Sequence, residues 1–140
     1  MEEIKIFTDG GSRGNPGPAA IGVYIENSAG KKLAGIGKKI GEATNNTAEY
    51  KAVIEAFDWL LENKETFQKE TRVLFFLDSL LVCSQMKGAW KIKDENLRSL
   101  YFTAKQKEEL LAIPVSYSHI PREKNKNADT LVNAALDNIL

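Results

Sequence analysis

The chain has little cysteine and little histidine, with one residue of each among 140. Because Cys83 is alone, neither an intrachain disulfide framework nor a cysteine-based zinc cluster can form. Long apolar runs are also missing, since none approaches the roughly 20 residues that a helix needs to cross a bilayer. The first residues, "MEEIKIF", lack the basic start and apolar stretch of a signal peptide. By elimination we expect a cytoplasmic protein that does not enter a membrane.

A surplus of either charge is absent as well, because 19 Lys and Arg balance 19 Asp and Glu. This balance argues against general coating of nucleic acid but leaves room for a local basic patch. A hydrophobic fraction of 43% over 140 residues is enough to build one core. The sequence shows no repeat, low-complexity segment or linker, so we predict a single domain over residues 1–140.

Apolar periodicity predicts an α/β fold in which strands come first and then alternate with helices. The predicted strands cover residues 4–9, 19–26, 31–40, 72–77 and 115–120. The predicted helices cover residues 44–64, 79–86, 94–112 and 125–137. The stretch 27–30, "NSAG", is typical of a hairpin turn between the second and third strands. Because residues 72–77 are apolar on both faces, that strand is expected near the centre of a mixed sheet, covered on both sides.

Four acidic residues fall at strand ends and helix starts: Asp9, Glu49, Asp78 and Asp129. Each has an ordinary structural explanation. Asp9 precedes a glycine, as turn residues do, and Asp129 would complement a helix dipole. Glu49 follows Asn46 by three residues, which fits a capping box, and Asp78 would compete with Ser79 for a helix N-cap. These separate explanations do not account for why all four acids fall at strand ends and helix starts. In an α/β fold such positions can come together at one site.

Convergent carboxylates repel one another unless a cation holds them together. Oxygen ligands without a histidine or cysteine cluster suit Mg²⁺ or Mn²⁺. Two such ions about 4 Å apart form the usual arrangement for in-line displacement at phosphorus. The residues alone therefore lead to the hypothesis of a two-metal phosphodiesterase or nuclease.

Four stretches of the chain form a specific combination in order and interval: "FTDGGSRGNPGPAAIG" (7–22), "TNNTAEYKAVIEA" (44–56), "LDSLLVCSQMKG" (77–88) and "HIPREKNKNADTLVNAALD" (119–137). On these stretches the chain resembles the type 1 ribonuclease H family over nearly its whole length. The resemblance implies a ribonuclease H-like fold, with a five-stranded mixed sheet whose second strand is antiparallel, flanked by helices. It also implies hydrolysis of the RNA strand of RNA–DNA hybrids, leaving 5′-phosphate and 3′-hydroxyl ends.

The resemblance further implies a role for each acid. Asp9, Glu49, Asp78 and Asp129 match the family's catalytic carboxylates, which hold two Mg²⁺ or Mn²⁺ ions. His119, the only histidine, matches a residue that assists proton transfer or product release. Loss of His119 is therefore expected to slow turnover without abolishing it.

The predicted substrate-binding residues fall into a glycine-rich segment, two asparagines and polar or basic positions: Gly10, Gly11, Ser12, Asn15, Asn45, Asn46, Ser79, Trp90, Lys91 and Arg122. The glycines would let the backbone approach the nucleic acid. The asparagines match family positions along the minor groove of the hybrid. The run "GGSRGNPG" fits neither dinucleotide-binding nor Walker A patterns, which excludes a nucleotide-cofactor site.

Several alternatives stay open. The segment "MKGAWKIKDEN" is shorter than the basic protrusion of many relatives, as in the archaeal and small bacterial branch that the chain resembles. The same chemistry could act on double-stranded RNA or RNA–DNA junctions. A non-catalytic nucleic-acid-binding module on the same fold is a third possibility, although such modules usually lose a metal ligand. The sequence favours a monomer and does not separate Mg²⁺ from Mn²⁺.

Overall fold

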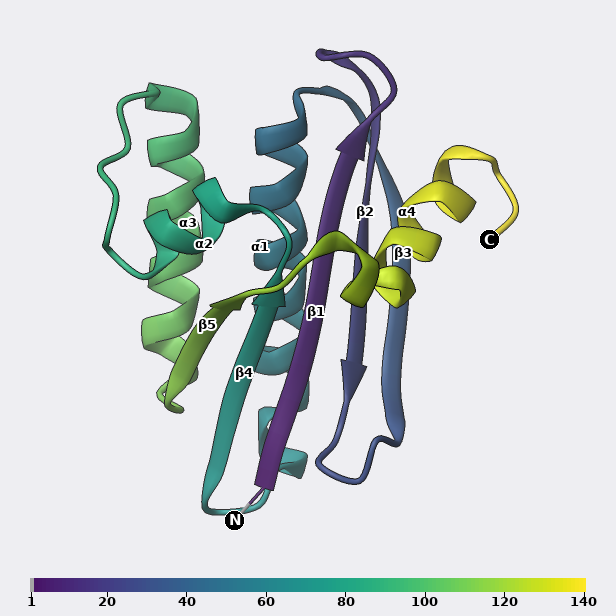
Figure 1. The fold of residues 1–140 in the computed structure, drawn as a ribbon. Helices are drawn as coiled ribbons and strands as arrows, with labels where there is room; N and C mark the ends of the chain where they lie inside the picture. The colour runs from purple at the N-terminus through teal and green to yellow at the C-terminus, as the bar shows by residue number, and fades with distance from the viewer. Residues whose placement is uncertain (1) are drawn as a thin grey trace.

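The computed structural model describes residues 2–140, which form an open five-stranded sheet with helices on both faces (Figure 1). The strands are β1 (Glu2–Ser12), β2 (Gly17–Glu26), β3 (Lys32–Ala43), β4 (Thr71–Leu77) and β5 (Val115–His119). The α-helices are α1 (Asn45–Asn63), α2 (Leu80–Met86), α3 (Glu95–Leu111) and α4 (Lys126–Leu136). Two short 3₁₀ helices, η1 (Lys64–Thr66) and η2 (Arg122–Lys124), were not predicted.

The strand order is β3-β2-β1-β4-β5, and the sheet is mixed. Strand β2 is antiparallel to both β1 and β3, whereas β1, β4 and β5 run parallel. The predicted five-stranded mixed sheet with an antiparallel second strand is therefore confirmed. Strand β4 ends at Leu77, which pairs with Thr8 of the longer, parallel β1, so the residue after β4 lies next to Asp9 within β1.

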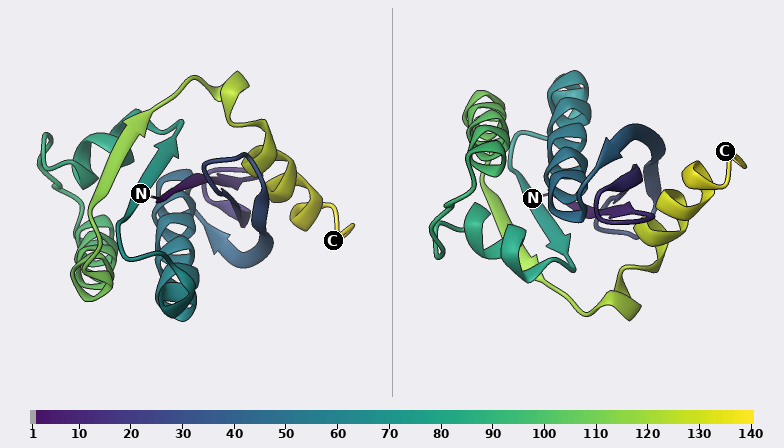
Figure 2. Two further views of the ribbon diagram at one scale, coloured as in Figure 1. Left: turned by 90° about the horizontal axis from the view of Figure 1, so that it is seen from below. Right: turned by 90° about the horizontal axis from the view of Figure 1, so that it is seen from above.

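The helices form two unequal layers. Helices α1 and α3 pack on each other and α1 packs on β1 and β2, so they cover one face (Figure 2). Helix α4 packs on β1, β2 and β3 from the opposite face. The main core lies between the sheet and α1, with Ile6, Val53, Phe57 and Phe75 fully buried. No helix within residues 2–140 is both long and apolar enough to cross a membrane.

Two glycines allow these helices to lie close to the central strands. A Cβ atom on Gly10 would lie 2.2 Å from the backbone carbonyl carbon of Ala48 in α1. A Cβ atom on Gly22 would lie 2.2 Å from the carbonyl oxygen of Ala128 in α4. Because real Cβ atoms do not approach backbone this closely, both helices could pack as they do only against glycine.

The prediction that residues 72–77 are covered on both faces is wrong in part. Val73, Phe75 and Leu77 are buried toward the helices, but Leu74 and Phe76 on the other face are only half-buried. The cause is the position of α4 over β1, β2 and β3. On the less covered face Phe76 stacks on Phe7 of β1, with ring centroids 4.9 Å apart.

Strand β1 is longer than predicted and includes the first part of the glycine-rich segment. Gly10 pairs with Ile21 and Gly11 pairs with Ala20 of β2. These two glycines therefore belong to the sheet and not to a flexible loop. At Gly10, the close backbone neighbour in the structure is α1, which gives this glycine a packing role that the sequence analysis did not predict.

Candidate active site

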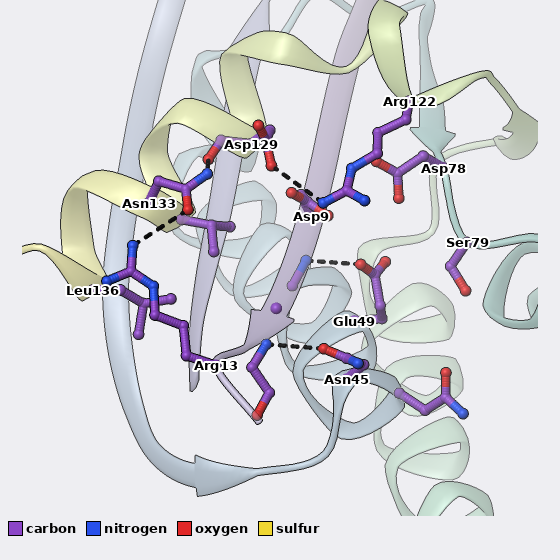
Figure 3. Close-up of a pocket in the computed structure, with 15 residues that line it drawn as sticks. Asp9, Arg13, Asn45, Glu49, Asp78, Ser79, Arg122, Asp129, Asn133 and Leu136 are labelled. Carbon is purple, nitrogen blue, oxygen red and sulfur yellow. Dashed lines mark hydrogen bonds and ion pairs between the residues drawn. The ribbon is translucent and has the colours of Figure 1, made fainter. Parts of the chain in front are cut away.

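The four predicted acids come from four different elements and gather at one edge of the sheet (Figure 3). Asp9 lies on β1, Glu49 on α1, Asp78 directly after β4 and Asp129 in the first turn of α4. Carboxylate oxygens of Asp9, Glu49 and Asp78 lie within 4.8 Å of one another. Asp129 lies on the other side of Asp9, outside that group of three. The convergence that the sequence could not demonstrate is thus present.

Local structure leaves Glu49 and Asp78 free of the helix-capping roles considered for them. Thr44, not Asn46, caps α1, because its side chain accepts a hydrogen bond from the Thr47 amide at 3.2 Å. The capping-box interpretation of Glu49 is therefore wrong. Ser79 caps α2 by accepting from the Val82 amide, so the N-cap interpretation of Asp78 is wrong as well.

Glu49 is instead held by the neighbouring strand. Its Oε1 atom accepts a hydrogen bond of 2.9 Å from the backbone amide of Gly10. Its Oε2 atom is buried and has no hydrogen-bond partner among the described residues. A buried carboxylate oxygen without a partner is costly unless a ligand, ion or proton occupies it. Glu49 therefore presents one fixed oxygen and one oxygen available for coordination.

Burial and mutual repulsion alter the acid–base behaviour of this cluster. Burial first, and then the charges of Asp78 and Asp129, raise the pKa of Asp9 to about 7. Burial first, and then the neighbouring Asp9 charge, raises the pKa of Glu49 well above its usual range. Both carboxyls thus tend to hold a proton near neutrality unless a cation replaces it.

The donor set fits a divalent cation of the hard type. It consists of carboxylate oxygens without a thiolate or imidazole in the group of three. Such oxygen ligands suit Mg²⁺ or Mn²⁺. The unpartnered Oε2 of Glu49 and the raised pKa of Asp9 are the features expected of a site whose positive charge is supplied by an ion.

A basic side chain also reaches this edge of the sheet. The guanidinium of Arg122, on η2, lies 3.9 Å from Oδ1 of Asp129 (Figure 3). The Arg122 side chain is 82% exposed, so this ion pair contributes little to stability. Its position at the mouth of the acidic pocket leaves its guanidinium accessible to an anionic ligand.

The acids lie in a pocket of about 490 Å³. Seven of the predicted substrate-binding residues line it with them: Gly10, Gly11, Ser12, Asn45, Asn46, Ser79 and Arg122. Asn15 does not line the pocket, and its side-chain oxygen accepts a hydrogen bond from the backbone amide of Asn45 at 3.0 Å. Asn45 in turn accepts from the Ser12 amide at 2.9 Å. The two asparagines therefore fasten the segment after β1 to the start of α1.

Three other predicted residues do not line the pocket. His119 is the last residue of β5, inside the predicted strand 115–120, and its Nε2 atom lies 3.3 Å from the backbone oxygen of Asp78. Trp90 and Lys91 lie in the segment between α2 and α3, on a separate exposed groove with Arg98 and Phe102. They form a second surface at some remove from the acids.

Four residues that line the pocket were not predicted from the sequence: the polar Arg13 and Asn133, and the apolar Val132 and Leu136. Arg13 pairs with Asp137 at 2.6 Å and also contacts Asn133, which joins the segment after β1 to α4. Helical spacing could have identified Asn133, which lies one turn after Asp129. Arg13 gave no comparable signal, since its partners are more than a hundred residues away.

Comparison with known proteins connects this arrangement to a family. Residues 7–135 match the family described as reverse transcriptase-like. The structure of a ribonuclease H1 isolated from compost by a metagenomic approach has 41% sequence identity and a TM-score of 0.93, covering 99% of this chain and 98% of that chain. The ribonuclease HI of Halobacterium salinarum is 43% identical over 136 residues. The chain belongs to the type 1 ribonuclease H family, and the predicted ribonuclease H-like fold is confirmed.

The matches differ in how much of each relative they include. The halobacterial match covers 96% of this chain and 64% of that protein. A bifunctional protein of Mycobacterium tuberculosis is 39% identical, but this chain spans only 36% of its length. The compost ribonuclease H1 has also been solved in complex with an RNA/DNA hybrid, and that structure has a TM-score of 0.87.

Proposed function

We propose that the protein is an endoribonuclease that hydrolyses the RNA strand of RNA–DNA hybrids. The observation that carries the proposal is the group formed by Asp9, Glu49 and Asp78, whose oxygens lie within 4.8 Å of one another in an open pocket. Family membership supports the reaction, and the hybrid complex of the compost ribonuclease H1 supports the substrate. The products would carry 5′-phosphate and 3′-hydroxyl ends.

The four acids would hold two Mg²⁺ or Mn²⁺ ions. Asp9, Glu49 and Asp78 would bind one ion through the oxygens that already converge, and Asp129 would help to bind the second beside Asp9. When bound, such ions stabilise the charge that develops on a phosphate during displacement. The amide of Gly10 keeps Glu49 oriented throughout, since it occupies one of the two carboxylate oxygens.

Two basic side chains would assist at the edge of this site. Arg122 would contact a phosphate, and the exposure of its guanidinium beside Asp129 supports this role. His119 would move a proton near the reacting phosphate, and the position of its ring beside the backbone of Asp78 supports this role. We propose catalytic roles for the four acids and His119, with His119 as the least essential of them.

The rest of the pocket would recognise the hybrid. Ser12, Asn45, Asn46 and Ser79 offer amide and hydroxyl groups to sugars, base edges and phosphates. A protein distinguishes RNA from DNA through the ribose 2′-hydroxyl, and such polar groups suit that recognition. The separate groove with Trp90 and Lys91 would bind a more distant part of the backbone by charge and stacking.

We also propose that residues 1–140 act as one ribonuclease H domain. The packing of α4 on the same sheet as α1 supports this, because both helices contribute acids to the site. A monomer and a cytoplasmic location belong to the same proposal. Size-exclusion chromatography with light scattering tests the monomer directly.

A cleavage assay on four labelled substrates tests the proposed function. These are RNA–DNA hybrid, double-stranded RNA, single-stranded RNA and double-stranded DNA, each with Mg²⁺, Mn²⁺ or a chelator. Metal-dependent cleavage of RNA in the hybrid alone is the expected result. Equal cleavage of double-stranded RNA would keep the chemistry but broaden the substrate. Hybrid binding without cleavage under any metal would favour a non-catalytic binding module.

A further inference from the structure

Asn125 is a fully buried polar residue between three of the acid-bearing elements. It precedes α4, and its side-chain nitrogen donates a hydrogen bond of 2.8 Å to the backbone oxygen of Thr8, one residue before Asp9. The same nitrogen donates to Oδ2 of Asp78 at 3.2 Å. One amide therefore connects β1, at the residue before Asp9, to the carboxylate that follows β4.

The backbone of Asn125 adds a third connection. Its carbonyl oxygen accepts a hydrogen bond of 3.1 Å from the amide of Asp129, within the first turn of α4. Its own amide donates to the carbonyl oxygen of Arg122 at 2.9 Å, which ties η2 to the helix start. Asn125 thus contacts Asp78, the first turn of α4 that carries Asp129, and β1.

The side chain is not fully satisfied by these contacts. Its Oδ1 atom is buried and has no hydrogen-bond partner within residues 2–140. An unpartnered buried oxygen is unfavourable for folding, so stability alone would not favour it. An apolar side chain would avoid that cost but would offer no donor to Asp78 or to Thr8. The hydrogen bonds that the side-chain nitrogen donates to Thr8 and Asp78 therefore explain why an asparagine occupies this position.

We propose that Asn125 is a positioning residue that fixes the Asp78 carboxylate relative to Asp9 for divalent-cation binding. This inference rests on the proposed function. The donor to Oδ2 restrains rotation of the Asp78 side chain, and so fixes how its carboxylate faces Asp9 and Glu49. Loss of the donor would let Asp78 rotate and would leave the cluster less preorganised.

Mn²⁺ binding, measured by isothermal titration calorimetry without nucleic acid, tests the inference. In Asn125→Ala the Mn²⁺ dissociation constant should rise about 10- to 100-fold, as for other residues that orient metal ligands. In parallel, kcat on the hybrid at fixed Mn²⁺ should fall while KM for the hybrid stays within about threefold, since Asn125 lies beneath the pocket surface. Asn125→Leu, which keeps the volume and removes the donors, should give the same metal-binding loss if the alanine variant is unstable.

Gln85→Ala is the matched control. Gln85 is also a buried amide, but its side chain accepts a hydrogen bond from Tyr50 at 2.5 Å and makes none to an acid. Its variant should lose stability without losing Mn²⁺ affinity. If both amide variants weakened Mn²⁺ binding equally, general destabilisation would explain the effect and the inference would fail.

A double-mutant cycle shows whether Asn125 acts through Asp78. In an Asp78→Asn background, Asn125→Ala should weaken Mn²⁺ binding by less than about threefold further, because the oriented ligand is already lost. Independent losses that multiply would overturn the inference. If wild type and Asn125→Ala bound Mn²⁺ with equal affinity, the inference about Asn125 would fail while the proposed function would stand. If the wild type did not bind Mn²⁺ at all, both the inference and the proposed function would fail.

Discussion

The backbone amide of Gly10 donates a hydrogen bond of 2.9 Å to Oε1 of Glu49. This contact joins the central strand to α1 where the helix backbone comes nearest, since a Cβ on Gly10 would meet the Ala48 carbonyl carbon at 2.2 Å. The glycine therefore serves two purposes, because it admits the helix and supplies the donor that orients an acid. Packing and catalytic geometry are set at the same residue.

Gly10→Ala should reduce the free energy of unfolding by about 3 kcal/mol, because the added methyl group meets backbone atoms that cannot turn aside. Gly11→Ala is the control, since its nearest neighbour would be the Val132 side chain at an ordinary 3.5 Å. That variant should change stability by less than about 1 kcal/mol. Urea unfolding of both variants measures the difference. Similar losses in the two would show that the tight helix contact is not what requires glycine at position 10.

The stability of the metal-free protein should fall as pH rises from about 4 to above 7. The pKa of Asp9 is raised from 3.8 to about 7 in the folded state, so the folded protein binds more protons than the unfolded chain in this range. The stabilisation from this proton is complete below the unfolded pKa and is lost as pH passes the folded value. Glu49 acts in the same direction.

Asp9→Asn should remove much of this pH dependence and stabilise the metal-free protein at pH 8 by a few kcal/mol, on the order of 2 to 4. Urea unfolding in chelator, at pH 5 and at pH 8, measures both effects. Identical pH slopes for the variant and the wild type would contradict the raised pKa of Asp9. The same variant should lose hybrid cleavage.

His119→Ala should lower kcat by about 100-fold with little change in KM, because a proton-transfer group is lost while the acids stay in place. Ser118→Ala, which changes the exposed preceding residue of β5, serves as the control. Steady-state kinetics on the hybrid compare the two variants. If His119→Ala kept the wild-type kcat, His119 would have no part in proton transfer, and its contact with the Asp78 backbone would be purely structural.

Lys91→Ala should weaken hybrid binding at low salt and reduce the slope of log K against log salt by about one. The exposed groove with Trp90 would lose one phosphate contact, whereas kcat should stay the same. Lys69→Ala is the control, because Lys69 is also exposed but lies just before β4, at the end of that strand opposite Asp78. Its salt dependence should equal that of the wild type. If the salt dependence of hybrid binding were the same in Lys91→Ala as in the wild type, the groove would not be part of the binding surface.

The periodic patterns were sufficient to predict every strand and α-helix, because each has a clear apolar face or an apolar run. The end of β1 was missed, since Gly10 to Ser12 carry no apolar signal yet pair with β2. The acids could be chosen from their places at strand ends and helix starts. The contacts that orient them could not, because Asn125 and Thr8 are 117 positions apart and only the folded sheet brings them together.

Cleavage of a hybrid labelled at the 5′ end of its RNA strand tests the central claim most directly. The wild type is compared with Asp9→Asn, Glu49→Gln, Asp78→Asn and Asp129→Asn, in Mg²⁺ or Mn²⁺ and in chelator. We predict metal-dependent cutting of the RNA strand that leaves labelled fragments with 3′-hydroxyl ends, lost in the variants at Asp9, Glu49 and Asp78 and strongly reduced at Asp129. Undiminished cutting by folded Asp9→Asn, or cutting that persists in chelator, would contradict the assignment of these acids as the metal-binding centre.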